Sequence, residues 1–198
     1  MNRHKGGRGW EYDCDGRIVL ERETQPARTQ GKPITMQGIW DDFGEHIEEA
    51  HGLFPVEPTI SRATIMAIIA LESVRLPGSH HRDPNSYRYE ERIDDYSAGL
   101  MQTLSKTAIA MRKRYLLPVP PIQRAVLCDP RVSIIVGTAY LFRLADRYGT
   151  TDGMLLQAAY NAGGVYTSDK NEWNLRTYSP DRTERFAQWH NDALEVLG

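Results

Sequence analysis

The stretch IMAIIALESVRLPG, Ile65–Gly78, is the most informative part of the sequence, because a long apolar run in it ends on a carboxylate shortly before a Pro-Gly pair. From Arg62 onward the run is apolar on nearly every side, which is typical of a helix that is buried all round. The Pro-Gly pair prevents the helix from continuing. We therefore predict a central buried helix that ends close to Glu72.

Glu72 is an unusual residue for the end of a buried helix, and its position suggests chemistry. A carboxyl group that faces a cleft at the end of an apolar helix loses hydration, and desolvation raises the pKa of a carboxyl group. A carboxyl group that stays protonated near neutral pH is what general-acid cleavage of a glycosidic bond requires. A solvated glutamate at a helix C-terminus is the common alternative, so this stretch alone leaves both interpretations open.

The composition is that of an ordinary globular chain and argues against several classes of protein. The 198 residues are 40% hydrophobic and 25% charged, which suits one compact domain with a core. The net charge of -2 argues against nucleic-acid binding by bulk electrostatics. No apolar stretch reaches the roughly 18–20 residues of a membrane-spanning helix, so we expect no membrane insertion. Cys14 and Cys128 cannot build a disulfide framework, although one bridge between them stays open.

Apolar spacing and helix terminators predict a mainly α fold, with one domain after an N-terminal arm. Residues 1–36 predict a partly irregular arm or cap with a short strand over 16–24, and residues 37–198 predict the helical domain. Residues 79–97 are polar and aromatic and predict a long loop or a small β-hairpin. The predicted helices cover 37–52, 57–73, 105–116 with Ser105 as the cap, 129–149, 150–164 and 181–197.

Four short segments follow each other in an order that is more informative than any one of them. They are Glu72-Ser73, then SAGLMQ over Ser97–Gln102 with Thr107-Ala108 after it, then Asp129-Pro130 through Ile134, Gly137, Tyr140 and Leu141, and finally AYNAG over Ala159–Gly163. This ordered set resembles the lysozyme-like family of soluble lytic transglycosylases and goose-type lysozymes, which cleave peptidoglycan. The resemblance covers roughly residues 38–190. It implies a lysozyme-like domain with a small β-hairpin or irregular loop region beside a cleft.

The resemblance implies a role for each matching residue. Glu72 matches the family's single catalytic acid/base, and Ser73 matches a residue near the sugar-binding cleft. Tyr160 and Asn161 match the aromatic and amide groups that border the acid and the sugars. The cleft wall that holds the N-acetyl sugar corresponds to Ser97, Gly99, Leu100, Met101 and Gln102.

The residue types fit these roles, although packing and capping are alternatives for some of them. Glycine lets a backbone approach a ligand closely, and a Gln side chain offers a donor and an acceptor to an acetamido group. A tyrosine ring gives a sugar a face to pack on, and its hydroxyl group can bond a carboxyl group. Core packing is the alternative for Leu100 and Met101, and helix capping is the alternative for Asn161–Gly163.

The number of carboxyl groups in the site separates two reactions. In the resembling transglycosylases one glutamate gives a proton to the glycosidic oxygen and then takes the proton of the sugar's own C6 hydroxyl group. This closes a 1,6-anhydro ring and consumes no water. Ordinary glycosidases use two carboxyl groups, and in goose-type relatives a second acid from the loop after the catalytic helix positions a water. Asp94 and Asp95 are the loop acids nearest to SAGLMQ and are our candidates for that acid, with a solvated acidic loop as the alternative.

We therefore predict an enzyme that cleaves the β-1,4 bond between N-acetylmuramic acid and N-acetylglucosamine, with an anhydro product favoured over hydrolysis. A non-catalytic glycan-binding module of a virion or a secretion apparatus is the alternative. The predicted partner is the peptidoglycan glycan strand, bound by a monomer. No metal or other cofactor is expected, because HIEEAH (His46–His51) lacks the zincin spacing and HHRD (His80–Asp83) lacks a third ligand.

The predicted place of action is the bacterial cell wall, in the periplasm or outside the cell. The basic N-terminus has no apolar segment after it and is not a Sec-type signal peptide. A phage product, a virion-associated lysin or an enzyme exported by a secretion apparatus would fit both observations.

Overall fold

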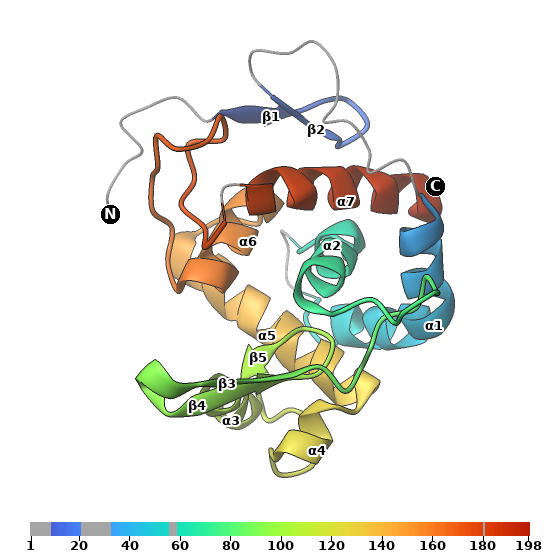
Figure 1. The fold of residues 1–198 in the computed structure, drawn as a ribbon, viewed down its shortest axis with the longest axis vertical. Coiled ribbons are helices and arrows are strands. Elements are labelled where there is room, and N and C mark those ends of the chain that lie inside the picture. Colours follow the sequence, from blue (N-terminus) through green and yellow to red (C-terminus); the bar gives the residue numbers. More distant parts are fainter. Residues whose placement is uncertain (1–8, 21–32, 56–58, 180) are drawn as a thin grey trace.

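The computed structural model describes residues 9–20, 33–55, 59–179 and 181–198, and helix α2 (Arg62–Glu72) lies at its centre. Figure 1 shows α2 surrounded by the other long helices. All residues from 63 to 70 are buried, which confirms the predicted central helix. The helix begins later than the predicted residue 57, because the Ser61 side chain accepts a 3.1 Å hydrogen bond from the Thr64 amide and caps the first turn. Pro58, predicted in the first helical turn, lies outside the described residues.

The remaining helices confirm the mainly α prediction; α1 and α7 pack against α2, whereas α3 and α4 pack against α5. Helix α5 lies within the predicted span, because the Asp129 side chain caps its start and Gly149 ends it in the left-handed conformation. Helix α1 begins before the predicted residue 37, and the short α4 was not predicted. The helices are α1 (Pro33–Gly52), α3 (Ser105–Tyr115), α4 (Arg124–Leu127), α5 (Pro130–Tyr148), α6 (Gly153–Ala162) and α7 (Asp181–Leu197).

The polar segment after α2 folds into a small antiparallel sheet, as the hairpin alternative predicted. Strand β3 (Tyr87–Glu90) pairs with β4 (Asp95–Ala98), which pairs with the short β5 (Thr103–Leu104). A 3-10 turn over Glu91–Ile93 connects β3 to β4. In Figure 1 this sheet lies on the opposite side of α2 from α7.

The start of α3 differs from the prediction. Ser105 is the first helical residue and Leu104 is the residue before the helix, without a side-chain cap. The Ser105 hydroxyl group donates instead to the Asp95 carboxylate, which also accepts a 3.2 Å hydrogen bond from the Lys106 amide. Asp95 on strand β4 thus caps the helix from outside, a role that the local sequence of α3 did not reveal.

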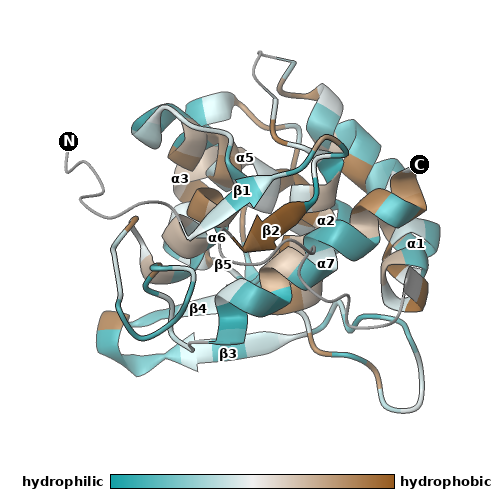
Figure 2. Cartoon of the chain, turned by 90° about the horizontal axis from the view of Figure 1, so that it is seen from above, coloured by the Kyte–Doolittle hydropathy of each residue, from teal (hydrophilic) through white to brown (hydrophobic). Residues whose placement is uncertain are grey.

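The described part of the N-terminal arm is a two-stranded hairpin docked on the helical domain. Strands β1 (Trp10–Tyr12) and β2 (Ile18–Leu20) pair antiparallel, which confirms the predicted strand. Asn191 of α7 accepts a 2.8 Å hydrogen bond from the Ile18 amide and donates a 3.0 Å bond to the Ile18 carbonyl oxygen. Figures 1 and 2 both show the hairpin lying along α7. Residues 33–36 of the predicted arm instead begin α1, and residues 1–8 and 21–32 lie outside the described residues.

The hairpin also contacts the start of α6. The Trp10 ring N–H and the Tyr12 hydroxyl group donate to the Asp152 carboxylate at 3.2 and 2.9 Å. Asp152 also caps α6 through the Met154 amide at 2.9 Å. Cys14 in the hairpin turn and the half-buried Cys128 are both free, so the possible bridge is not formed. Within the described ranges, no helix combines the length and the apolar character needed to cross a membrane.

Candidate active site

Glu72 is the last residue of α2, and Ser73 ends that helix. The backbone of Ser73 is extended, its amide still donates to the Ile69 carbonyl oxygen, and its hydroxyl group donates to the same oxygen at 2.5 Å. Ser73 is buried, and its own carbonyl oxygen accepts a 3.3 Å hydrogen bond from Arg82. The predicted sugar-side serine therefore has its hydroxyl group occupied by the helix end.

The Glu72 carboxylate forms an ion pair with Arg182, from the first turn of α7. Only 15% of the Glu72 side chain and 17% of the Arg182 side chain are exposed. Burial raises the pKa of Glu72 above its ordinary value, and the Arg182 charge opposes this without reversing it. Desolvation thus favours the protonated acid, as the sequence predicted, but the cation beside it was not predicted.

Tyr160 lies close to the same carboxyl group. Its hydroxyl group donates to the Met101 carbonyl oxygen and shares a hydrogen bond with the Thr103 hydroxyl group, both at 2.9 Å. Burial raises the pKa of Tyr160, and the negative charge of Glu72 adds to that rise. Tyr160 therefore links α6 to the SAGLMQ turn beside the acid, and the structure brings together Glu72 and Tyr160 as predicted.

Asn161, the next residue of α6, holds the loop that leads to α7. Its side-chain oxygen accepts a 2.9 Å hydrogen bond from the Tyr178 amide. The helix ends after it, with Gly163 in the left-handed conformation. The Asn161 side chain, predicted to border the sugars, thus holds the segment 163–179 in place, and this segment leads to Arg182 in α7.

The polar side chains of the SAGLMQ turn form hydrogen bonds within the protein. The Gln102 amide nitrogen donates to the Ser86 and Gly99 carbonyl oxygens at 3.0 and 2.8 Å, and the Ser97 hydroxyl group donates to the Gln102 oxygen at 2.9 Å. Leu100 and Met101 are fully buried, which fits the packing alternative for both. The five predicted wall residues lie together, but their side chains contact protein groups.

Asp94 and Asp95 have separate positions at the turn between β3 and β4. Asp95 is buried and accepts hydrogen bonds from the Ser105 hydroxyl group and from the Tyr96 and Lys106 amides. Asp94 is exposed, has a left-handed backbone, and accepts a 2.6 Å bond from the Tyr89 hydroxyl group. The pKa of Glu72 responds to burial and to Arg182 rather than to either aspartate.

Arg182 was not predicted, because residues 181–197 were interpreted only as an amphipathic helix. Its position in the first turn of that helix was nevertheless informative. A cation is unfavourable at a helix N-terminus, where Asp181 and Glu184 of the same turn are favourable. A basic residue placed against this preference has another partner, and in this fold the partner is Glu72.

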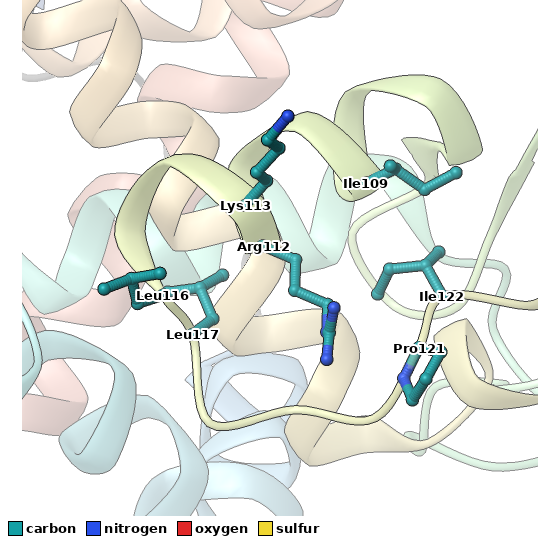
Figure 3. Close-up of a pocket in the computed structure, with 7 residues that line it drawn as sticks. All are labelled: Ile109, Arg112, Lys113, Leu116, Leu117, Pro121 and Ile122. Atoms are coloured by element: carbon teal, nitrogen blue, oxygen red, sulfur yellow. The ribbon is translucent and has the colours of Figure 1, made fainter.

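Two surface hollows lie apart from Glu72. Figure 3 shows the larger, a cavity of about 630 Å³ between the end of α3 and the segment after it. Apolar side chains such as Ile109, Leu116 and Ile122 line it together with Arg112 and Lys113. The smaller, of about 460 Å³, is formed by residues 167–178 and includes Tyr178, whose amide is bonded to Asn161. Glu72 lines neither of these two cavities, so the site is defined here by its side chains.

A comparison with models of protein families found a match. The sequence model of the transglycosylase SLT domain matches residues 56–186, more than half of the chain. This chain belongs to the transglycosylase SLT family. It is therefore an enzyme that cleaves glycosidic bonds of peptidoglycan, binds glycan strands and acts on the cell wall. A search among curated proteins found no match.

The family assignment confirms the lysozyme-like fold and decides against a purely binding module. The matched span contains Glu72, the SAGLMQ turn, Tyr160 and Arg182. The β1–β2 hairpin, α1 and most of α7 lie outside it. These elements pack around the SLT core, and α7 supplies Arg182 from within the matched span.

Proposed function

We propose that this SLT transglycosylase cleaves the β-1,4 bond between N-acetylmuramic acid and N-acetylglucosamine, with Glu72 as the only acid/base and a 1,6-anhydro sugar as the product. The observation that carries the proposal is the buried Glu72 carboxyl group at the end of α2, whose raised pKa favours its protonated form. Tyr160 beside it and the order of the family motifs support the same assignment.

One carboxyl group is sufficient for both halves of this reaction. In the first half, the protonated Glu72 gives its proton to the glycosidic oxygen, and the bond between that oxygen and C1 of the muramic acid breaks. In the second half, the C6 hydroxyl oxygen of the same sugar bonds to C1, and its proton passes to the Glu72 carboxylate. The carboxyl group is then protonated again, and no water has been consumed.

The positions of the two loop acids favour this reaction over hydrolysis. A hydrolase with two carboxyl groups needs the second one near the reacting carbon, so that it can hold a water. Asp95 is buried and caps α3, and Asp94 is exposed and bonded to Tyr89. We therefore assign the reaction to Glu72 alone, and hydrolysis with help from Asp94 or Asp95 is the alternative that a product analysis tests.

The test is mass spectrometry of the soluble products released from purified peptidoglycan. The wild-type protein should release muropeptides that end in the anhydro sugar, each lighter by one water than the hydrolytic product. Glu72→Gln should fold normally and lower the rate of release by about 10²–10⁴-fold, because it cannot transfer a proton. Glu45→Gln, an exposed change on α1, is the matched control and should leave the rate unchanged.

Two results would contradict the proposal in different ways. Products that carry the added water would exclude the anhydro-forming reaction while leaving Glu72 as the acid. An unchanged rate in the Glu72→Gln variant would remove Glu72 from the reaction altogether.

A further inference from the structure

The Glu72–Arg182 ion pair joins two charges that each occupy the unfavourable end of a helix. Glu72 is at the C-terminal end of α2, where the helix dipole disfavours an anion, and the last turn of α2 contains no basic residue. Arg182 is in the first turn of α7, where the dipole disfavours a cation. Each helix alone would be more stable without its charge. The two charges are therefore explained by their interaction with each other rather than by the stability of either helix.

Three influences act on the Glu72 carboxyl group, and Arg182 is the one that favours its charge. Burial raises the pKa of Glu72, and the dipole of α2 acts in the same direction. The Arg182 guanidinium lowers that pKa by its charge and by its hydrogen bond. Without it, the carboxyl group would stay protonated over a wider pH range.

A proton-transfer group that works twice needs this balance. The proposed reaction uses Glu72 first as an acid and then as a base, and a group with a pKa far above the working pH is a poor base. We propose that Arg182 is a positioning residue of this reaction: it holds the Glu72 carboxyl group at the end of α2 and offsets the effect of burial on its charge, so that one group serves both halves. This inference rests on the proposed role of Glu72.

The surroundings of Arg182 keep it in place. Its amide donates to the Ser179 carbonyl oxygen at 3.1 Å, and the next residue, Thr183, is fully buried and accepts a 3.4 Å hydrogen bond from Gln157 of α6. Arg182 is thus fixed at its backbone by the start of α7 and at its guanidinium by Glu72. The Nε–H of the same guanidinium has no hydrogen-bond partner among the described residues.

The other ionisable groups near Glu72 cannot replace this cation. On α6, Tyr160 is neutral at the working pH because burial raises its pKa. In the segment after α2, Arg82 points one nitrogen to the Ser73 carbonyl oxygen, and burial lowers its pKa to about 10. Arg82 does not shift the pKa of Glu72, whereas Arg182 does.

The competing explanation is that the ion pair only fastens α2 to α7. Such a contact would add stability, and its loss would lower the melting temperature without changing the pH dependence of the reaction. Removal of the cation would raise the pKa of Glu72 in either case, so the two explanations differ in one measurable quantity, the position of the alkaline limb in the pH profile of the reaction.

The experiment compares Arg182→Gln and Arg182→Lys with the control Arg185→Gln. Arg185 lies on the same helix and forms an exposed ion pair with Asp181 at 2.6 Å, so its loss has the same formal charge change at a distance from Glu72. The pH profile of kcat/KM for release of anhydro products is measured for each protein. The titration of the Glu72 carboxyl carbon is followed by NMR on protein labelled with ¹³C at the glutamate carboxyl groups and assigned with Glu72→Gln.

Removal of Arg182 should raise the pKa of Glu72 by about one to three units, the usual effect of an adjacent opposite charge. Because the reaction needs the protonated acid first, the alkaline limb of the profile should move to higher pH by the same amount in Arg182→Gln. Arg182→Lys should move it less, and Arg185→Gln should not move it.

The outcomes separate this inference from the proposed function. An NMR titration and an alkaline limb that both stay at the wild-type position in Arg182→Gln, with a lower melting temperature, would leave Arg182 a structural contact. A shifted titration with an unshifted limb would also overturn the inference, since Arg182 would then act on a group that does not limit the reaction. Failure of the proposed function shows separately, as full activity in Glu72→Gln.

Discussion

The end of α2 and the turn Ser97–Gln102 both lie in the span that matches the SLT family and both carry residues that resemble its motifs, yet the two regions use their side chains differently. At the end of α2, the Glu72 side chain pairs with Arg182, 110 positions further along the chain. In the turn, the side chains of Ser97 and Gln102 bond to each other and to backbone groups close by. In one region the carboxyl group pairs with a residue far along the chain, and in the other the polar side chains fix the backbone of the turn itself.

Residues that resemble motifs of one family can therefore differ in role. The proton transfer that we propose for Glu72 needs a side chain free of local bonds. The hydrogen bonds within the turn make its backbone rigid, which suits the cleft wall that the resemblance implies. Three predictions test the comparison and follow in order of expected effect. Two change the turn, and the third changes the loop acids Asp94 and Asp95 that precede it.

Gly99→Ala should be the most damaging change. Gly99 has φ +80°, and a Cβ atom there would lie 1.9 Å from the Leu127 carbonyl oxygen. The clash and the left-handed backbone together should cost about 3 kcal/mol or more of unfolding free energy. Gly163→Ala is the control, because its φ is +71° but nothing lies within 4 Å of the added atom, so it should cost about 1 kcal/mol. Urea unfolding measures both, and equal losses would show that the backbone angle alone matters.

Gln102→Ala should lower stability as well as activity. The change removes two donated hydrogen bonds and one accepted bond, and it leaves the Ser86 carbonyl oxygen without this donor. We expect a loss of about 2 kcal/mol in urea unfolding. Ser97→Ala, which removes one of these bonds, should cost about 1 kcal/mol. A raised KM with unchanged stability in Gln102→Ala would instead show that the amide binds the sugar, as the family resemblance implied.

Asp95→Asn and Asp94→Asn should separate the two loop acids. Asn can still accept hydrogen bonds at Asp95, but without the charge the cap of α3 weakens, so urea unfolding should show a loss of about 1–2 kcal/mol. The exposed Asp94 should change stability by less than about 0.5 kcal/mol. Both variants should keep the wild-type ratio of anhydro to hydrolytic products. A changed ratio in either one would identify it as the acid that positions a water.

The fold and the acid were predictable because their signals are local and periodic. The apolar run before Glu72 is typical of a helix that is buried all round, and Pro77-Gly78 limits how far that helix can continue. The polar segment after it could be read as a hairpin, and the order of the motifs indicated the family. The residues at the end of α2 and at the end of α6 were thus predicted to lie together, and they do.

The partners of these residues were not predictable in the same way. The contacts of Arg182 with Glu72 and of Asp95 with Ser105 join positions that no periodicity relates. Ser105 looks like a cap in sequence, but the cap is supplied by an aspartate on a neighbouring strand. Side chains that are shared between elements become visible only when the elements are packed.

The β1–β2 hairpin couples the local opening of the two ends of the described chain. The side chain of Asn191 binds both backbone groups of Ile18, 173 positions earlier, so the chain is closed into a ring at this point. Closing so long a ring costs only slightly more entropy than closing a short one, because the cost grows with the logarithm of length. Because Asn191 lies in the second half of α7, opening that part of the helix breaks both hydrogen bonds to Ile18 of β2. We therefore expect the amide hydrogens of β2 and of the second half of α7 to exchange as one unit.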